Sequence, residues 1–160
     1  IFDVTEPSYP GGVGRIAGYG FSQNNVNLAN VTVTPNAWTD LGFALAGTHG
    51  APLLTGLGTM LPGSSGTLTL SNAAGPDALA MLFISASAAP TPFKGGTLVT
   101  VPVLSSIATT TFGNPGSVPV AWSNWPAGLS GLVAYFQYGI VDGAGPLGVA
   151  LSNAVRVDVP

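Results

Sequence analysis

The chain has 160 residues, with three basic and six acidic side chains and a net charge of −3 at pH 7. Charged residues make up 6% of the sequence, whereas about 25% is usual for a soluble domain. Three Lys and Arg residues are too few to neutralise the phosphates of a nucleic acid, so the composition excludes nucleic acid as a partner. The same shortage argues against attachment to anionic lipid headgroups.

Glycine and proline determine the fold class that we expect. The 23 Gly and 14 Pro residues are far too many for a helical bundle. Together with Ser and Thr they interrupt every apolar stretch before it reaches the roughly 18 residues of a membrane-spanning helix. With no cysteine, the chain has no disulfide framework and no thiolate metal ligand. We therefore predict an all-β chain that forms one β-sandwich or jelly-roll-like domain and does not insert into a membrane.

The predicted elements begin with Ile1–Thr5, where apolar and polar side chains alternate ahead of Pro7 and Pro10. This segment is either the first strand of its own sheet or part of an N-terminal arm, residues 1–10, that is exchanged between subunits. Residues 11–160 are then the β-sandwich domain. Period-two alternation between turn-forming clusters predicts about nine or ten short antiparallel strands in all. The clearest are Leu28–Thr34, Leu41–Ala46, Gly66–Ser71, Leu79–Ser85, Thr97–Leu104, Ser117–Trp122, Leu132–Val141, Gly148–Leu151 and Val155–Val159.

Two of these strands contain a proline. Pro102 lies within Thr97–Leu104, and Pro119 lies within Ser117–Trp122. Proline cannot donate a hydrogen bond to a neighbouring strand, so sheets tolerate it at edges and bulges. We therefore predict that both strands lie at sheet edges.

The most distinctive stretch runs from Leu132 to Asn153 and contains a long aromatic-rich strand, an Asp-Gly turn and a second strand that ends in Ser-Asn. This stretch resembles the C-terminal pattern of uncharacterised secreted β-domains of planctomycetes and some myxobacteria. The resemblance is carried by Tyr135, Phe136, Gln137, Val141, Asp142, Ser152, Asn153 and Ala154. It implies a secreted bacterial β-sandwich and brings no assigned activity. Tyr135 and Phe136 are adjacent on one strand, so at most one of them belongs to the core.

Few side chains offer catalytic chemistry. His49 is the single histidine, and a triad would need a hydroxyl and a carboxylate such as Asp40 beside it; a solvated loop histidine is the favoured interpretation. A glycosidase using Asp40 with a second carboxylate is a distant alternative, because the spacing of the acids indicates no such pair. Asp142 is expected to stabilise a turn, and calcium binding there is less favoured. We expect no enzyme activity, no cofactor and no metal.

Five aromatic residues could build a surface for stacking against a sugar: Trp38, Trp122, Trp125, Tyr135 and Tyr138. The leading candidates among them are Trp122, Trp125 and Tyr138. Exposed aromatic faces among neutral polar residues are typical of glycan-binding modules. The favoured alternative is that Trp122 ends a strand in the core and Trp125 covers a loop. A secreted carbohydrate-binding or adhesive module is therefore the second functional hypothesis.

Several features point to a secreted protein. The sequence begins at Ile1 without an initiator Met or an apolar leader, as expected for a mature secreted chain. Asn30-Val31-Thr32 is an Asn-x-Thr sequon, which makes Asn30 a candidate glycosylation site in such a chain. We expect a location outside the cell or at its surface.

The shortage of charge also predicts self-association. Natural β-proteins commonly protect their sheet edges with Lys, Pro or bulges, and this sequence has few charges to use. We therefore predict a structural subunit of an extracellular filament, sheath or surface layer, which binds copies of itself through sheet edges and strand addition. Ile1, Phe2 and Val4 are the residues expected to anchor this joint.

Overall fold

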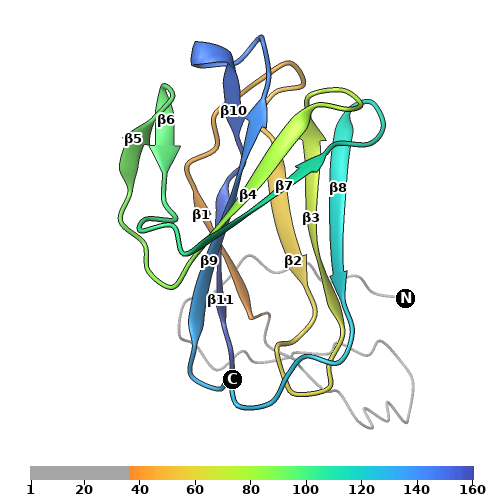
Figure 1. The fold of residues 1–160 in the computed structure, drawn as a ribbon, viewed down its shortest axis with the longest axis vertical. Helices are drawn as coiled ribbons and strands as arrows, with labels where there is room; N and C mark the ends of the chain where they lie inside the picture. The colour runs from red at the N-terminus through yellow and green to blue at the C-terminus, as the bar shows by residue number, and fades with distance from the viewer. Residues whose placement is uncertain (1–36) are drawn as a thin grey trace, which may run out of the picture. The chain divides into compact units, whose positions relative to one another are not determined.

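A computed structural model of the chain describes residues 37–160 (Figure 1). The predicted arm at residues 1–10, the domain boundary at residue 11 and the strand Leu28–Thr34 lie outside these residues. The all-β prediction is confirmed, because the described part consists of strands in antiparallel sheets with one three-residue 3₁₀ turn, Pro146–Gly148. The strands are β1 Trp38–Gly42, β2 Leu53–Leu57, β3 Gly66–Ala73, β4 Leu79–Ser85, β5 Thr91–Phe93, β6 Gly96–Leu98, β7 Ser105–Thr110, β8 Gly116–Trp122, β9 Val133–Val141, β10 Val149–Leu151 and β11 Ala154–Asp158. Within residues 37–160, no helix has the length and apolar character needed to span a membrane.

Two larger sheets and one hairpin organise these strands. The largest sheet has the order β1-β11-β9-β4-β7, and β10 also pairs with β9. The second sheet has the order β2-β3-β8, while β5 and β6 form a separate hairpin. Side chains of both larger sheets meet in one buried cluster, which makes the architecture β-sandwich-like. In this arrangement β1 and β7 are the outer strands of the first sheet, and β2 and β8 are those of the second.

Alternation along the central strands explains which side chains form the core. In β4, Ala80 and Leu82 are buried, whereas Leu79 on the opposite face is exposed. The same period holds in β9, where Phe136 packs against the core cluster. Tyr135 is not part of that cluster, in agreement with the prediction that at most one of the two aromatic residues belongs to it.

Trp38 links the two sheets. Its ring lies against the backbone of Gly56 in β2, where an added Cβ atom would come within 2.0 Å of the indole. Its Nε1 donates to Gly58 O at 3.1 Å. The rings of Trp122 and Phe136 lie beside it, each with a centroid 5.8 Å from that of Trp38. The core at this point is therefore aromatic and depends on a glycine that leaves room for the largest side chain.

Two strand predictions are wrong in position. The prediction Leu41–Ala46 falls on β1, which ends at Gly42 because Gly42 and Phe43 take positive φ angles of 77° and 68°. The prediction Thr97–Leu104 is wrong beyond Leu98, because the chain leaves β6 there. Pro102 therefore lies in a loop and not in an edge strand. Pro119, in contrast, lies in the outer strand β8 as predicted.

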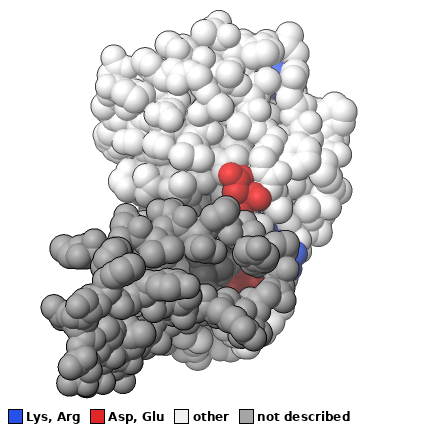
Figure 2. All heavy atoms as spheres, turned by 180° about the vertical axis from the view of Figure 1, so that it is seen from behind, with Lys and Arg blue, Asp and Glu red and all other residues white. Residues whose placement is uncertain are grey.

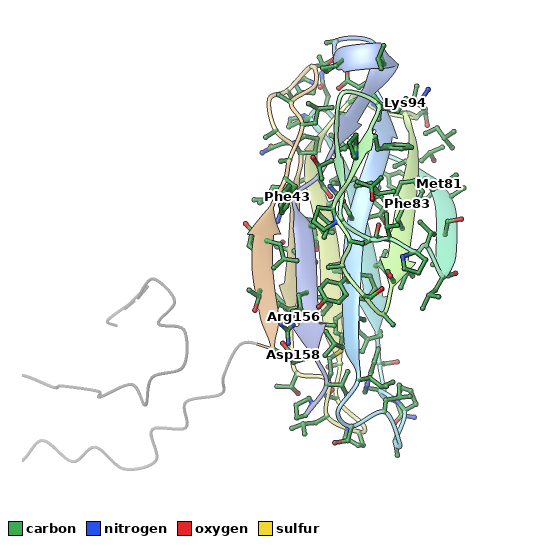
Figure 3. The ribbon with its side chains drawn as sticks, turned by 90° about the vertical axis from the view of Figure 1, so that its left-hand side faces the viewer. Phe43, Met81, Phe83, Lys94, Arg156 and Asp158 are labelled. Atoms are coloured by element: carbon green, nitrogen blue, oxygen red, sulfur yellow. The ribbon has the colours of Figure 1, made fainter. Side chains whose placement is uncertain are left out.

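The described surface carries few charges. On the face seen in Figure 2, the described atoms belong almost entirely to uncharged residues. Arg156 of β11 forms an ion pair with Asp158, at an N–O distance of 2.5 Å, and both side chains are partly exposed (Figure 3). Contacts on this surface are thus governed by backbone and apolar groups more than by charge.

Candidate functional site

Four residues predicted to take part in a site lie outside the described residues: Ile1, Phe2, Val4 and Asn30. The other predicted site residues are placed by the structure.

Tyr138 is buried, which corrects its prediction as a sugar-stacking residue. Only 1% of its surface is exposed, because it lies on the core face of β9 opposite Leu82 of β4. Burial raises the pKa of its phenol above the usual value. The ring cannot meet a ligand from solution, so the predicted row of three aromatic side chains does not form.

Trp122 and Trp125 are half-buried and pack edge to face, with ring centroids 6.0 Å apart and planes inclined by 65°. Trp122 lies over Gly66 of β3, where an added Cβ atom would come within 2.2 Å of its ring. The indole N–H groups of both residues are buried and have no hydrogen-bond partner among the described residues. Inclined rings with inward N–H groups do not form the flat platform on which a sugar stacks.

His49 lies exposed in the turn between Gly47 and Gly50. The neighbouring hydroxyl, Thr48 Oγ1, donates directly to Asp142 Oδ1 at 2.6 Å. Asp40 Oδ1 instead accepts hydrogen bonds from Asn153 Nδ2 and Gly42 N. These groups therefore lack the hydroxyl–imidazole–carboxylate order of a catalytic triad. Among residues 37–160, no three His, Cys, Asp or Glu side chains lie together as metal ligands would.

Asp142 joins two loops that are distant in sequence. Its Oδ1 accepts a hydrogen bond from Ala144 N at 3.0 Å, which confirms the predicted role in a turn. Its Oδ2 accepts a bond from Thr48 N at 2.8 Å, which was not predicted. Gly47 leaves room for the carboxylate, since an added Cβ atom would lie 2.1 Å from Oδ2. Burial alone would raise the pKa of Asp142, but the hydrogen bonds from Thr48 and Ala144 and the nearby His49 together lower it below its usual value.

We expect Asp142 to make the stability of the fold depend on pH in acid. A carboxyl with a lowered pKa in the folded state stabilises the fold above the unfolded pKa of about 3.9, and this stabilisation is lost as the pH falls through the folded pKa. Urea denaturation at neutral pH and below the folded pKa measures the loss. The variant D142N should lose less free energy of unfolding between the two conditions than the unmodified chain. An equal loss in both proteins would contradict this role.

Gln137 and Ser152 form a network of buried, hydrogen-bonded polar groups. Gln137 Oε1 accepts a hydrogen bond from Val99 N at 2.8 Å, and its Nε2 donates to the carbonyl oxygens of Thr97 and Ser152. Ser152 Oγ accepts a bond from Tyr138 N at 2.9 Å. Buried polar groups are stable only when they are paired in this way. The C-terminal pattern noted in the sequence thus contains residues with structural roles.

Asn153 occupies the outer edge of β2 as a neighbouring strand would. Its Oδ1 accepts a hydrogen bond from Leu54 N at 2.6 Å, and its Nδ2 donates to Leu54 O at 3.0 Å. Farther along β2, Trp38 covers Gly56 and donates to Gly58 O. Asn153 therefore occupies the outward backbone groups of Leu54, and Trp38 occupies the carbonyl oxygen of Gly58, which hinders the addition of a further strand to β2.

Two more outer strands are protected in other ways. A bulge between Asp40 and Gly42 interrupts the ladder of β1, and Asp40 adds a charge. In β8, the backbone of Ser117 bonds to Phe112 on the side away from β3. Because backbone groups alternate along a strand, Pro119, which has no N–H, also faces that outer side. Bulges, charges and prolines all hinder strand addition.

The outer strand β7 has none of these features. Its sequence, Ser-Ser-Ile-Ala-Thr-Thr, contains no charge, glycine or proline, and it pairs with β4 without a register shift. Thr111 N donates to Ala78 O on the β4 side, so alternation directs the backbone groups of Ser106, Ala108 and Thr110 outward. The strands β1, β7, β2 and β8 end the two strand orders, and of these four described strands β7 alone is unprotected. The short strand β10, which pairs with β9, is bridged on its other side by Leu45 at Leu151.

The inner face beside β7 is incompletely covered. Ile107 faces the core side, opposite Leu82, yet 51% of its surface is exposed. Val120 of β8, which pairs with the buried Leu68, is 37% exposed. β7 and β8 meet at the Phe112–Ser117 bridge and run apart from there (Figure 1). We call the outward backbone of β7 together with Ile107 and Val120 the β7 edge.

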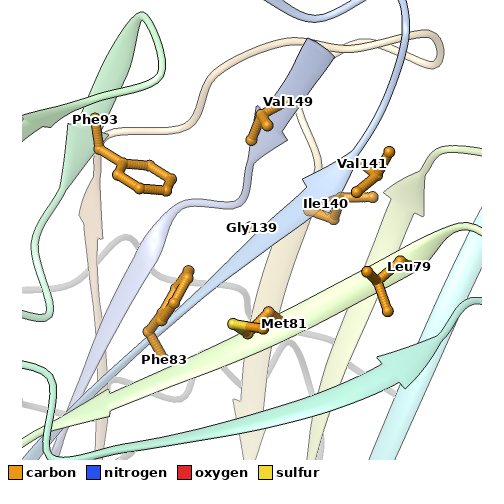
Figure 4. Close-up of a pocket in the computed structure, with 8 residues that line it drawn as sticks. All are labelled: Leu79, Met81, Phe83, Phe93, Gly139, Ile140, Val141 and Val149. Atoms are coloured by element: carbon orange, nitrogen blue, oxygen red, sulfur yellow. The ribbon is translucent and has the colours of Figure 1, made fainter. Parts of the chain in front are cut away.

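A shallow hollow of about 130 Å³ lies on the outer face of the largest sheet (Figure 4). Phe93 of the β5–β6 hairpin and Phe83 of β4 meet there edge to face, with ring centroids 6.1 Å apart. The lining is apolar and consists of Leu79, Met81, Phe83, Phe93, Gly139, Ile140, Val141 and Val149. Because it offers no polar side chain to orient a ligand, the hollow lacks the specific contacts of a small-molecule site.

Sequence reasoning missed the β7 edge. Ser105–Thr110 has one large apolar side chain, so period-two alternation gave no signal there. The β-branched Ile and Thr residues were the available signal for a strand. The hydrogen bonds by which Asn153 caps the outer edge of β2 had no signal in the sequence, because the partner residue Leu54 lies 99 positions earlier.

Comparison of the chain with known protein families, with curated proteins and with solved structures found no match.

Proposed function

We propose that the chain is a non-enzymatic structural subunit that binds copies of itself outside the cell, in a filament, sheath or surface layer. The observation that carries this proposal is the β7 edge, where outward backbone groups lie beside the exposed side chains of Ile107 and Val120. An unprotected strand edge pairs with another chain, because each new backbone hydrogen bond satisfies a donor and an acceptor.

The protection of the other outer strands supports a role for β7. Asn153 and Trp38 close β2, a bulge interrupts β1, and Pro119 hinders pairing at β8. A fold that blocks three of these four outer strands and leaves the fourth unblocked directs association to one place. The scarcity of charge acts in the same direction, since little electrostatic repulsion opposes contact between copies.

The proposed location rests on the resemblance of the C-terminal stretch to secreted β-domains. A contact that joins different surfaces of two copies, repeated without closing on itself, produces a filament. This proposal needs no catalytic group, cofactor or metal.

The variant I107K tests the proposal. An inward-pointing charge at an edge strand hinders strand addition, and Ile107 is exposed enough to accept a lysine without a large loss of stability. We expect the unmodified chain to form large species in sedimentation velocity and regular assemblies in negative-stain electron microscopy. The I107K variant should sediment mainly as a monomer under the same conditions.

Leu57 provides the matched control, because it is a 66% exposed apolar residue in the protected strand β2. The variant L57K adds the same charge and should leave assembly unchanged. If the unmodified chain remains monomeric at high concentration, the proposed function is refuted. If both variants lose assembly equally, assembly depends on general surface hydrophobicity and not on the β7 edge.

A further inference from the structure

Building on the proposed function, we propose that the β7 edge accepts one strand from a second copy of the chain, and that this strand is Leu28–Thr34. The acceptor lies wholly within the described residues. The donor is a segment that the structure does not describe and that the sequence predicts as a strand.

The acceptor has the geometry for a single added strand. Ser106, Ala108 and Thr110 offer their backbone groups on the outer side of β7. A strand that pairs there would turn alternate side chains inward, onto Ile107 and Val120, and would cover apolar surface that is now exposed. Pro119 makes β8 a poor partner, so the added strand pairs with β7 alone.

The donor sequence, Leu-Ala-Asn-Val-Thr-Val-Thr, matches this site in length and pattern. Its seven residues compare with the six of β7, and none is charged. With Val31 and Val33 turned inward, two β-branched apolar side chains meet the two half-exposed ones of the acceptor. In this pairing Asn30 and Thr32 would face the other side of the sheet, beside the small side chains of β7.

The chain length favours a donor from another copy. The four steps from Thr34 to Trp38, where β1 begins, span at most about 14 Å. In the sheet order β1-β11-β9-β4-β7, a strand added at the free edge of β7 lies five strand spacings from β1, which amounts to about 24 Å. The connection is shorter than this distance, so we expect the donor to come from a second copy.

Each copy then carries one donor segment and one acceptor edge. Such head-to-tail exchange extends without limit when the rotation between copies does not close a ring. The same contact that covers the β7 edge would thus produce the filament proposed above.

Disulfide cross-linking tests the contact. Because the chain has no cysteine, the introduced residues are the only thiols that can react. Full-length A108C, isotopically labelled, is mixed in turn with unlabelled N30C, T32C and T34C and oxidised gently. Opposed residues on adjacent antiparallel strands have Cα atoms about 4.5–5.5 Å apart, which suits a disulfide, and the three donor positions allow for different registers. The matched acceptor control is A121C, an exposed alanine on the outer side of β8.

At least one donor variant should form the mixed disulfide with A108C at about tenfold higher yield than with A121C, measured by mass spectrometry, because docking raises the local thiol concentration. Equal yields with both acceptors overturn the inference. Preferential linking of A108C to D3C would assign the site to Ile1–Thr5 and also overturn it. So would a T32C/A108C double variant that closes its disulfide within one molecule. If the chain assembles in sedimentation experiments but none of these disulfides forms preferentially, the inference about the donor strand is wrong and the proposed function is unaffected. If the chain does not assemble, the proposed function is wrong as well.

Discussion

Replacing Asn153 by leucine is expected to lower the free energy of unfolding by about 3 kcal/mol, because it leaves a buried backbone donor and acceptor without partners. Leucine has a similar shape but cannot accept from Leu54 N or donate to Leu54 O. The carboxylate of Asp40 also loses the donor Asn153 Nδ2. Since Asn153 is almost fully buried, water cannot easily replace these bonds.

Urea denaturation at neutral pH measures this loss, and amide hydrogen exchange locates it. The Leu54 amide should exchange much faster in N153L than in the unmodified chain, because its acceptor is gone. The control D40A removes one exposed partner of Asn153 and keeps both bonds to Leu54, so it should cost no more than about 1 kcal/mol. A comparable loss in D40A and N153L would show that the cap on β2 contributes little.

The variant G56A should destabilise the fold by about 3 kcal/mol through overpacking. A methyl group at Gly56 would lie within 2.0 Å of the ring of Trp38, which is itself held between Trp122 and Phe136. The ring is buried and packs against two other aromatic rings, so it cannot shift without displacing them. The cost therefore arises from strain in the core and not from backbone conformation.

Gly143 is the matched control for this prediction, since a Cβ atom there would meet nothing within 4 Å. G143A should change the free energy of unfolding by less than about 0.5 kcal/mol. In a W38L background the additional effect of G56A should shrink, because the two sites share one space. Thermal unfolding of the unmodified chain, G56A, G143A, W38L and the double variant W38L/G56A measures these effects. A full cost of G56A in the W38L background would exclude the clash with Trp38 as its cause.

Local patterns were sufficient to predict most of the strands. Leu79–Ser85 was predicted with the bounds that β4 has, and the predictions for β3, β8 and β9 differ from the structure by one or two residues at an end. These strands alternate strongly because one face of each lies on the core. The position of Pro119 in an outer strand was predicted from another local rule, because proline cannot donate a hydrogen bond to a neighbouring strand.

The strands β2 and β7 were missed because they have few large buried side chains that alternate with polar ones. In β2 one of the two buried positions is Gly56, which provides space for Trp38 and gives no apolar signal of its own. β7 is mostly exposed, so selection for a core face did not shape its sequence. Beyond Leu98, the amide of Val99 bonds to the side chain of Gln137 instead of a strand, which no local pattern could show.

The sequence by itself determined the fold class, the scarcity of charge and the turn positions, because glycine, proline and side-chain alternation act on the backbone within a few residues. Only the tertiary structure decided which edge is open. The cap on β2 joins Leu54 to Asn153, and the exposed face of Ile107 depends on how β7 and β8 diverge. Both depend on the order of strands in the sheets, and that order is set by packing between residues far apart in the chain.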